Sequence, residues 1–435
     1  MPALKDKLAA KISAAQAEVH HTLETWGDRT LSEVSVAQAY GGMRGVKCMV
    51  TETSAVDPLE GIRYRGHSIP QLQELLPKAH GGTEPLPEGV FYLLLTGDIP
   101  TSDEVAEITA AWRADEDLPG YVSGALDRMP RETHPMTQLS MGILAMQPGS
   151  IFARRYREGL PKTEHWDAMF DDSMRLLAKI PLLAAYIYRR TYHDGRHLAP
   201  ARKLDWAANL AYMMGVEKPE FREMLRLYLS ILADHEGGNV SAHATHLVGS
   251  ALSDPYYSLS AGINGLAGPL HGLANQEVMR WIFGVKEKLG GGVPTKEQLS
   301  EFLWETLRSG QVVPGYGHGV LRATDPRYLA QRQFALKHAP DDENVKIVEM
   351  LFELVPEILT QHGKAKNPWP NVDAYTGSLL VHYGVTEYDF YTVLFGVSRA
   401  IGVLASLIWD RALMLPLERP KSVTTRWIRE QMSAS

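Results

Sequence analysis

Residues 393–409 read VLFGVSRAIGVLASLIW, an apolar run that contains one charged side chain, Arg399. This run is the nearest approach to a membrane span in the chain. An arginine near its middle argues against lipid, because a charged group at that depth is costly unless it faces a protein interior. We therefore predict a buried helix over residues 393–413 of a soluble protein. Arg399 should then face either an internal acid or a bound anion.

Helical patterns also fill most of the chain on the N-terminal side of this run. Apolar residues recur at three- and four-residue steps over residues 4–26, which predicts an amphipathic helix with Gly27 as its C-cap. Further helices joined by short loops are predicted over residues 166–178, 219–232, 276–289, 296–309 and 344–359. No fixed-period repeat is present, which disfavours a helical solenoid. Because nearly every segment is predicted to be helical, the predicted fold class is all-α.

One N-terminal segment, residues 40–66, has a strand-like sequence. The runs 46–51 and 62–64 are separated by a turn that contains Pro58 and Gly61, which predicts a minor β-hairpin or meander. The single cysteine, Cys48, lies in the first of these runs and can form no internal disulfide. We interpret it as a structural thiol in a strand rather than a nucleophile.

Composition narrows the class of protein without identifying a function. The 435 residues are 45% hydrophobic and 22% charged, with a formal net charge of −7, as in an ordinary soluble globular protein. The absence of a basic excess makes nucleic acid an unlikely partner. No signal or transit peptide is visible, so we expect that any organellar targeting segment has been removed from this sequence.

The first of four distinctive polar segments is DHEGGNVSAHATH, residues 234–246. Its histidine spacing does not match a standard zinc pattern, so a metal site is disfavoured. The glycine pair after Glu236 lets backbone approach a bound molecule, which favours a ligand-binding role for His235. His243 and His246 are better explained as structural histidines with satisfied hydrogen bonds.

The second segment places His271 between a Gly-Pro break and a helix that starts near Asn275. A helix N-terminus favours the neutral imidazole, which can donate a hydrogen bond to a carbonyl that is becoming an enolate. The alternative is a histidine that only caps the helix.

The third and fourth segments are VVPGYGHGVLR, residues 312–322, and GKAKNPWPNVD, residues 363–373. Glycines around His318 allow backbone N–H groups to face a ligand, and Arg322 and Arg327 add anion-binding capacity. Two prolines make a stiff approach to Asp373, which in isolation would be interpreted as a solvated loop acid.

Taken together, these four segments, in this order, resemble the citrate synthase family, and in particular its animal and fungal mitochondrial type. The resemblance runs from about residue 41 to residue 422. It implies an all-α fold with a large domain over residues 1–274 and 385–435, which carries the dimer interface. A small domain over residues 275–384 would carry the CoA-binding residues, His318 and Asp373.

The resemblance implies a condensation of acetyl-CoA with oxaloacetate and water that yields citrate and CoA, in the mitochondrial matrix. His271 would hydrogen-bond the thioester carbonyl, Asp373 would remove the methyl proton, and His318 would donate a proton to the oxaloacetate carbonyl. The oxaloacetate carboxylates would be held by His235, Arg327, Arg399 and, from the other subunit of a homodimer, Arg419.

The resemblance also implies CoA contacts and excludes some requirements. The CoA-binding residues would be Arg44, Val312, Val313, Pro314, Gly315, Tyr316, Gly317, Arg322 and Lys366. Neither a cofactor nor a metal is implied, since two histidines, an aspartate and three arginines suffice for the chemistry. No nucleic acid or membrane partner is implied.

Three positions depart from the usual mitochondrial pattern. Tyr375 and Thr376 stand where histidine and serine are usual, and Gly319 stands where alanine is commoner. These positions adjoin catalytic candidates, so 2-methylcitrate synthase, which uses propionyl-CoA, is the alternative function. A non-catalytic scaffold or a metal-dependent hydrolase would be a more distant alternative.

Overall fold

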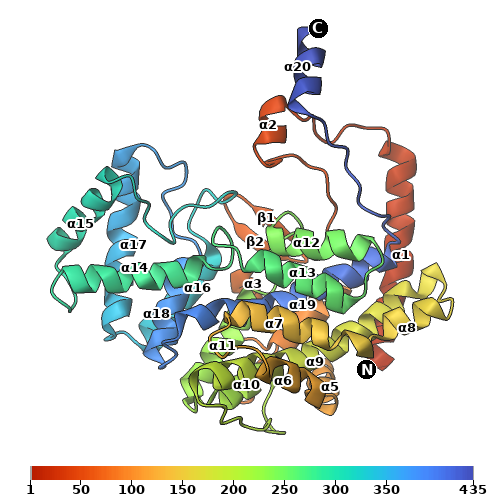
Figure 1. Cartoon of the computed structure of the whole chain (residues 1–435), viewed down its shortest axis with the longest axis horizontal. Coiled ribbons are helices and arrows are strands. Elements are labelled where there is room, and N and C mark those ends of the chain that lie inside the picture. The colour runs from red at the N-terminus through yellow and green to blue at the C-terminus, as the bar shows by residue number, and fades with distance from the viewer. Residues whose placement is uncertain (1, 435) are drawn as a thin grey trace.

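The computed structural model describes residues 2–434 and consists almost entirely of helices (Figure 1). The larger group of helices, here called the main body, comprises α1 (Pro2–Trp26), α3 (Ile69–Leu75), α4 (Pro87–Thr96), α5 (Ser102–Ala114), α6 (Gly120–Asp127), α7 (Pro135–Ala145), α8 (Ile151–Arg157), α9 (His165–Tyr192), α10 (Trp206–Met214), α11 (Pro219–Ile231), α12 (Val240–Ser250), α13 (Pro255–Leu266) and α19 (Tyr391–Ala412). Short 3-10 helices occur at Gln147–Gly149, Lys162–Glu164 and Tyr388–Phe390.

A second group of helices lies to one side of the main body, at the left of Figure 1. This α14–α18 group comprises α14 (Ala274–Lys288), α15 (Lys296–Arg308), α16 (Pro326–His338), α17 (Glu343–His362) and α18 (Asp373–His382). Within the group, α18 contacts α14, α16 and α17. Contacts of α16 with α3 and α11, and of α14 with α19, join it to the main body.

The apolar run that carries Arg399 forms the central helix α19, as predicted. It packs against α4, α9, α11, α12 and α13, and most of its side chains are buried. In the described part of the chain it is the one helix long and apolar enough to span a bilayer, yet 94% of its most apolar window is buried inside the protein. Such burial is typical of a core helix of a soluble protein.

The other predicted helices are confirmed, with one difference in length. The helix predicted over residues 166–178 continues in α9 to Tyr192, through Pro181. Its buried face continues after the proline with Leu183, Ala184 and Ile187. Packing of this long apolar face therefore outweighs the cost of the missing N–H of an internal proline.

The only sheet in the described residues is small, and its first strand is not where the sequence indicated. β1 (Ser54–Asp57) pairs antiparallel with β2 (Gly61–Tyr64), which pairs with β3 (His67–Ser68). The strand predicted over residues 46–51 is wrong: that run is irregular, and Cys48 is exposed. Asp57 Oδ1 accepts the N–H groups of Leu59 and Glu60 at 2.7 and 2.8 Å, which fixes the β1–β2 turn, and β1 begins three residues after that run.

Two segments extend away from the main body, at the top of Figure 1. One carries α2 (Val36–Tyr40), and the other is the C-terminal arm, residues 414–434, with α20 (Thr425–Ser433). Tyr40 Oη and Thr425 Oγ1 lie 2.6 Å apart, so the two segments touch each other. Both leave large apolar side chains exposed, among them Leu31 at 77% and Met432 at 59%. Exposed apolar surface of this kind is suited to contact with another protein.

Candidate active site

A cavity of about 250 Å³ lies where the main body meets the α14–α18 group. It brings together six of the seven residues expected to carry chemistry or bind oxaloacetate: His235, His271, His318, Arg327, Asp373 and Arg399. The seventh, Arg419, is exposed on the C-terminal arm and does not line this cavity. The six converge from five separate stretches of the chain.

The small sheet supports the loop that carries His235. Thr53 Oγ1 and Ser54 Oγ donate to Asp234 Oδ2 at 2.6 and 2.8 Å, and Asp234 Oδ1 accepts the N–H of His235 at 2.9 Å. The hydroxyl of Tyr64, on β2, accepts the N–H of Asp234 at 3.0 Å. Burial raises the pKa of Asp234 above its usual value, against the opposing effects of its hydrogen bonds and of nearby Arg399. The loop is therefore held by several hydrogen bonds that converge on one buried carboxyl.

His235 is prepared to meet a ligand as a neutral imidazole. Burial, together with the positive charges of Arg327 and Arg399, holds its pKa well below the usual range. Its Nδ1 is buried and has no hydrogen-bond partner among residues 2–434. A buried polar atom without a partner is costly, so a polar ligand at this point would gain stability from filling it.

Arg399 is buried without a carboxylate partner. Its Nη1 donates to Asn239 Oδ1 and Ser241 Oγ, both at 3.0 Å, and its Nε donates to the carbonyl of Leu232 at 3.4 Å. These partners are neutral, and burial lowers the pKa of the guanidinium to about 10. Of the two alternatives for this side chain, an internal ion pair does not occur in the described residues. A bound anion is the alternative that remains.

Arg327 differs, because its charge is already balanced. Asp325 is the N-cap of α16, and its carboxylate accepts the N–H of Arg327 at 2.9 Å. The same carboxylate binds the guanidinium through Nε at 3.0 Å and Nη2 at 2.7 Å. This bidentate pair fixes the plane of the guanidinium. Although burial alone raises the pKa of Asp325, Arg327 holds it below its usual value, so the pair stays ionised.

The neighbours of His271 determine which ring nitrogen carries its proton. The backbone N–H of Ser241 donates to His271 Nε2 at 3.3 Å, so Nε2 must hold a lone pair. The proton is then on Nδ1. Burial, with a smaller effect of Arg399, lowers the pKa of the imidazole to about 4. Burial and Arg399 thus favour the neutral ring that the sequence predicts.

His318 has the opposite tautomer. Its Nδ1 accepts the N–H groups of Val320 and Leu321, both at 3.0 Å, so its proton is on Nε2. Burial and the charge of Arg327 lower its pKa to about 4. The rings of His318 and His235 lie 5.5 Å apart between centroids. The cavity therefore contains two neutral N–H donors with known orientation, His271 Nδ1 and His318 Nε2.

Asp373 is the first residue of α18 and lines the cavity. Its backbone N–H donates to Asn371 Oδ1 at 3.0 Å, which caps the helix start. Burial raises the pKa of its carboxyl to about 7, against the opposing effects of Arg327 and Arg399. A carboxyl with a pKa near the working pH is suited to general base catalysis. The solvated loop acid is therefore the wrong alternative.

This raised pKa predicts an acidic limb in the pH profile. Asp373 must be ionised to accept a proton, so kcat/KM for oxaloacetate should fall about tenfold per pH unit below about pH 7. The two histidines with pKa values of about 4 remain neutral over this range and add no limb. The check is kcat/KM between about pH 8 and about pH 5.5, with folding followed by circular dichroism. A flat profile over that range contradicts the assigned ionisation.

Two loops are joined to bring His318 and Asp373 to the same cavity. Gly317 N–H donates to the carbonyl of Trp369 at 3.0 Å, and Asn371 N–H donates to that of Gly315 at 2.9 Å. Gly315 has φ +80°, and a Cβ there would lie 2.8 Å from the Cβ of Ala374. Glycine at 315 thus allows the loop to approach the start of α18.

A second cavity, of about 390 Å³, adjoins the first through His318, which lines both. Of the residues expected to bind CoA, it is lined by Val312, Val313, Tyr316, Gly317 and Lys366. Pro314 and Gly315 belong to the loop but do not line it. Arg322 is turned onto its own loop, where Nη1 donates to the carbonyls of Val320 and Leu321 at 2.8 and 2.7 Å. Arg44 lies on the exposed segment after α2 and lines neither cavity.

Some residues of the site were not anticipated from the sequence. Asn239, Glu236, Asn371 and Phe395 also line the first cavity. Asn239 is the N-cap of α12, where its Oδ1 accepts the N–H of Ala242 at 3.2 Å as well as the Arg399 guanidinium. An asparagine directly before a helix is a recognisable N-cap signal, so this residue could have been found. No local signal indicates the other three.

Tyr375, one of the residues that depart from the family pattern, lies outside both cavities. Its ring packs on Tyr328 at 5.3 Å, its hydroxyl donates to Glu349 Oε1 at 3.1 Å, and it lines neither cavity. We expect Tyr375→Phe to leave the acetyl-CoA to propionyl-CoA preference unchanged and to cost about 1–2 kcal/mol of unfolding free energy in urea. Tyr328→Phe is the matched control, because the buried Tyr328 hydroxyl has no hydrogen-bond partner among residues 2–434 and its loss should cost less. A changed acyl preference would refute this assignment.

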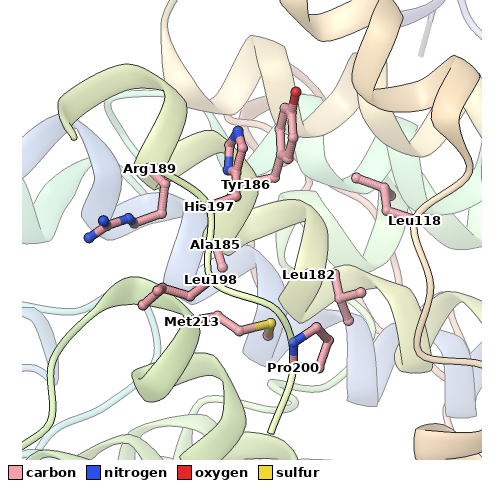
Figure 2. Close-up of a pocket in the computed structure, with 9 residues that line it drawn as sticks. All are labelled: Leu118, Leu182, Ala185, Tyr186, Arg189, His197, Leu198, Pro200 and Met213. Carbon is pink, nitrogen blue, oxygen red and sulfur yellow. The ribbon is translucent and has the colours of Figure 1, made fainter. Parts of the chain in front are cut away.

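Other polar clusters and cavities do not compete with this site. No group of three or more His, Cys, Asp or Glu side chains arranged to hold a metal occurs in residues 2–434. Figure 2 shows a smaller cavity, of about 100 Å³, in the main body, where Tyr186 and His197 stack at 3.9 Å between centroids. Its lining is mostly apolar and includes none of the predicted site residues.

The chain is similar to known proteins over most of its length. A family model described as the C-terminal domain of citrate synthase matches residues 42–421. The chain is 55% identical over 423 residues to the mitochondrial citrate synthase of Xiphias gladius, covering 97% of this chain and 90% of that protein. It is also 55% identical over 423 residues to the probable mitochondrial citrate synthase of Glossina morsitans morsitans, covering 97% of this chain and 91% of that protein.

Solved structures with lower sequence identity also resemble this chain. The citrate synthase of Pyrobaculum aerophilum has a TM-score of 0.75 at 27% identity, over 88% of this chain and 92% of that one. A ternary complex of the Thermoplasma acidophilum citrate synthase with carboxymethyl coenzyme A and oxaloacetate has a TM-score of 0.74. It shares 21% identity over 90% of this chain and 97% of that one, so its likeness concerns the fold alone.

Proposed function

The chain belongs to the citrate synthase family, and we propose that the six residues gathered in the cavity of about 250 Å³ perform the family's reaction. The protein is a mitochondrial enzyme that condenses acetyl-CoA with oxaloacetate and water to give citrate and CoA. The observation that carries the assignment of roles is the convergence of a buried carboxyl with a pKa of about 7 and two neutral imidazole donors on one cavity.

The first chemical step forms an enol from the acetyl group. A thioester α-proton is too weakly acidic for a free carboxylate to remove unaided, so the developing oxyanion must be stabilised as the proton leaves. Asp373 is the base, and His271 Nδ1–H is the donor to the thioester oxygen. Support comes from the raised pKa of Asp373 and from the backbone bond that directs the proton of His271 to Nδ1.

The second step joins the enol carbon to the carbonyl carbon of oxaloacetate. His318 Nε2–H donates its proton to the carbonyl oxygen as the new bond forms. Arg327, Arg399 and His235 hold the carboxylates, and the unpaired guanidinium of Arg399 is the strongest support for an anion at this place. Water then hydrolyses the citryl thioester. We infer that no metal or cofactor beyond the two substrates takes part.

The adjoining cavity is the proposed CoA site. Val312, Val313, Tyr316, Gly317 and Lys366 line it, and the loop that forms it ends at His318. We assign Pro314 and Gly315 to shaping that loop. We still propose that Arg322 and Arg44 contact the phosphates of CoA. For this, the side chain of Arg322 would have to turn away from its own loop, and Arg44 would have to reach the site through a different position of the subunits. The proposed small domain, residues 275–384, coincides closely with the α14–α18 group. Movement of that group would close the cavity around both substrates.

We also propose a homodimer in which Arg419 completes the oxaloacetate site of the other subunit. Arg419 is exposed and lines neither its own oxaloacetate cavity nor the adjoining one. A second copy of the chain would cover the exposed apolar side chains of the C-terminal arm and of the α2 segment. This arrangement makes the pair of chains the catalytic unit.

The direct test is release of free CoA thiol from oxaloacetate plus either acetyl-CoA or propionyl-CoA, in the presence of EDTA. We expect strong preference for acetyl-CoA and no effect of the chelator. One methylene is worth about 1–3 kcal/mol in a fitted apolar pocket, so the preference should be about 10- to 200-fold. Release with neither thioester would refute the proposed roles, and inhibition by EDTA would refute the metal-free mechanism.

A further inference from the structure

Two histidines on α12, His243 and His246, take no part in the proposed chemistry but share one carboxylate. His243 Nε2 lies 2.8 Å from Glu418 Oε1, and His246 Nε2 lies 3.4 Å from Glu418 Oε2. The other nitrogen of His246, Nδ1, lies 2.7 Å from Asp410 Oδ2. The two histidines are three positions apart on the helix and therefore face the same side.

The backbone at Glu418 is held by the same helix. Its N–H donates to the hydroxyl of Ser250, the last residue of α12, at 3.1 Å. Three contacts from α12 thus converge on one residue of the C-terminal arm. From residue 419 to residue 427 every side chain is exposed. Glu418 is therefore the last anchored residue before Arg419.

The charges around this cluster favour an ionic attachment. His246 faces Glu418 from the arm and Asp410 from α19, with Arg411 of α19 opposing. The hydrogen bond to Asp410 raises the pKa of His246, which favours the imidazolium. His243 can donate to Glu418 as a neutral ring, whereas His246, whose Nδ1 faces Asp410, can donate to both carboxylates only as the imidazolium.

The position of these histidines links them to the chemistry of their own subunit as well. Ser241, two residues before His243, contacts Arg399 and His271 in the oxaloacetate cavity. The helix α12 therefore contacts the oxaloacetate cavity through Ser241 and the C-terminal arm through the residues that follow. Because α12 packs against α13 and α19, it is a rigid support for the arm.

We propose that His243 and His246 are positioning residues that, by clamping Glu418 to α12, fix the point from which Arg419 enters the partner's oxaloacetate site. This inference rests on the proposed function, in which Arg419 acts on the other subunit. An unclamped arm would have to lose conformational freedom each time Arg419 bound a carboxylate. Loss of the clamp should therefore raise KM for oxaloacetate about fivefold, with kcat and dimerisation nearly unchanged.

The test uses heterodimers with a single working site. One subunit carries Asp373→Asn and keeps its arm, and the other carries Arg419→Ala and keeps Asp373. If Arg419 acts on the partner, the second subunit's site is active, because it receives Arg419 from the first. Differently tagged subunits are co-expressed and purified over both tags, and KM for oxaloacetate is measured by CoA thiol release.

Glu418→Ala is then placed in one subunit at a time. In the Asp373→Asn subunit, whose arm serves the working site, it should raise KM for oxaloacetate about fivefold. In the Arg419→Ala subunit, whose arm is already disabled, it should change nothing. A purely structural role of Glu418 within its own chain gives the reverse result, because the working site belongs to the second subunit. That reverse result, or equal effects, overturns the clamp.

Two further variants sharpen the outcome. The double change His243→Asn and His246→Asn in the Asp373→Asn subunit should reproduce the rise in KM, and adding Glu418→Ala to it should cause no additional rise. Glu430→Gln is the matched control, since Glu430 lies on the same arm but pairs with Arg426 at 2.7 Å instead of with α12. An equal effect of Glu430→Gln would overturn the clamp. A starting heterodimer without activity would instead overturn the proposed trans role of Arg419.

Discussion

Asp373→Asn should lower kcat about a thousandfold, within the range that a positioned general base contributes. Asparagine keeps the shape of the side chain but cannot accept the acetyl methyl proton. Its amide should not disturb oxaloacetate binding, because Arg327 and Arg399 hold the carboxylates. The measurement is kcat by CoA thiol release, together with oxaloacetate affinity by calorimetry.

The same substitution should not destabilise the empty enzyme above about pH 7. Burial raises the pKa of Asp373 from its unfolded value to about 7, so the folded state binds the proton more tightly. Folding stability is therefore lost as pH rises through that range, and a neutral side chain removes the loss. Asp389→Asn is the control, since Asp389 is half-exposed and pairs with Arg280 away from the cavity. A fall in kcat of less than about tenfold would rule out Asp373 as the base.

Arg399→Met should weaken oxaloacetate binding about 100- to 1,000-fold while leaving the free enzyme as stable as before or more so. The guanidinium is buried and bonded only to neutral oxygens of Asn239, Ser241 and Leu232, so its burial is a cost until an anion binds. Methionine fills a similar volume without that cost. Calorimetry measures the affinity, and thermal unfolding with and without oxaloacetate measures the stability.

Arg226→Met is the matched control for this pair of effects. Arg226 is also buried, but it forms ion pairs with Asp205, at 2.6 Å, and with Glu223. Breaking a buried pair leaves uncompensated charge and should cost about 3–5 kcal/mol of unfolding free energy. If Arg399→Met destabilised the free enzyme to a similar extent, the arginine would be part of the folding core rather than of an anion site.

Much of the fold and of the candidate site could be predicted from the sequence. The apolar run of α19 could be assigned because its length and its single arginine exclude the alternatives. His235, His271, His318 and Asp373 stood out because each lies beside glycine or proline breaks, where loops meet helix starts. The convergence of these residues on one cavity depends on contacts between distant segments, and it was supplied by the family resemblance rather than by any local pattern.

The errors have physical causes that a local pattern does not carry. The run 46–51 has strand-like residues, but the turn bonds of Asp57 and the anchoring of Thr53 and Ser54 on Asp234 shift the strand toward the C-terminus. The length of α9 depends on a buried face that continues beyond Pro181. Arg44 and Arg419 lie on segments that leave the main body, so the contacts of a single chain do not define their partners.

The close approach at Gly315 has an evolutionary consequence. A side chain at 315 would meet Ala374 at 2.8 Å and Val278 at 3.0 Å, and the backbone there has φ +80°. Any side chain at position 315 is therefore strained, and the side chain at position 374 must be small. Two positions with no proposed role in the chemistry are thus constrained by the close approach of the loop to α18. In a lineage that changed either one, we expect a compensating change at the other.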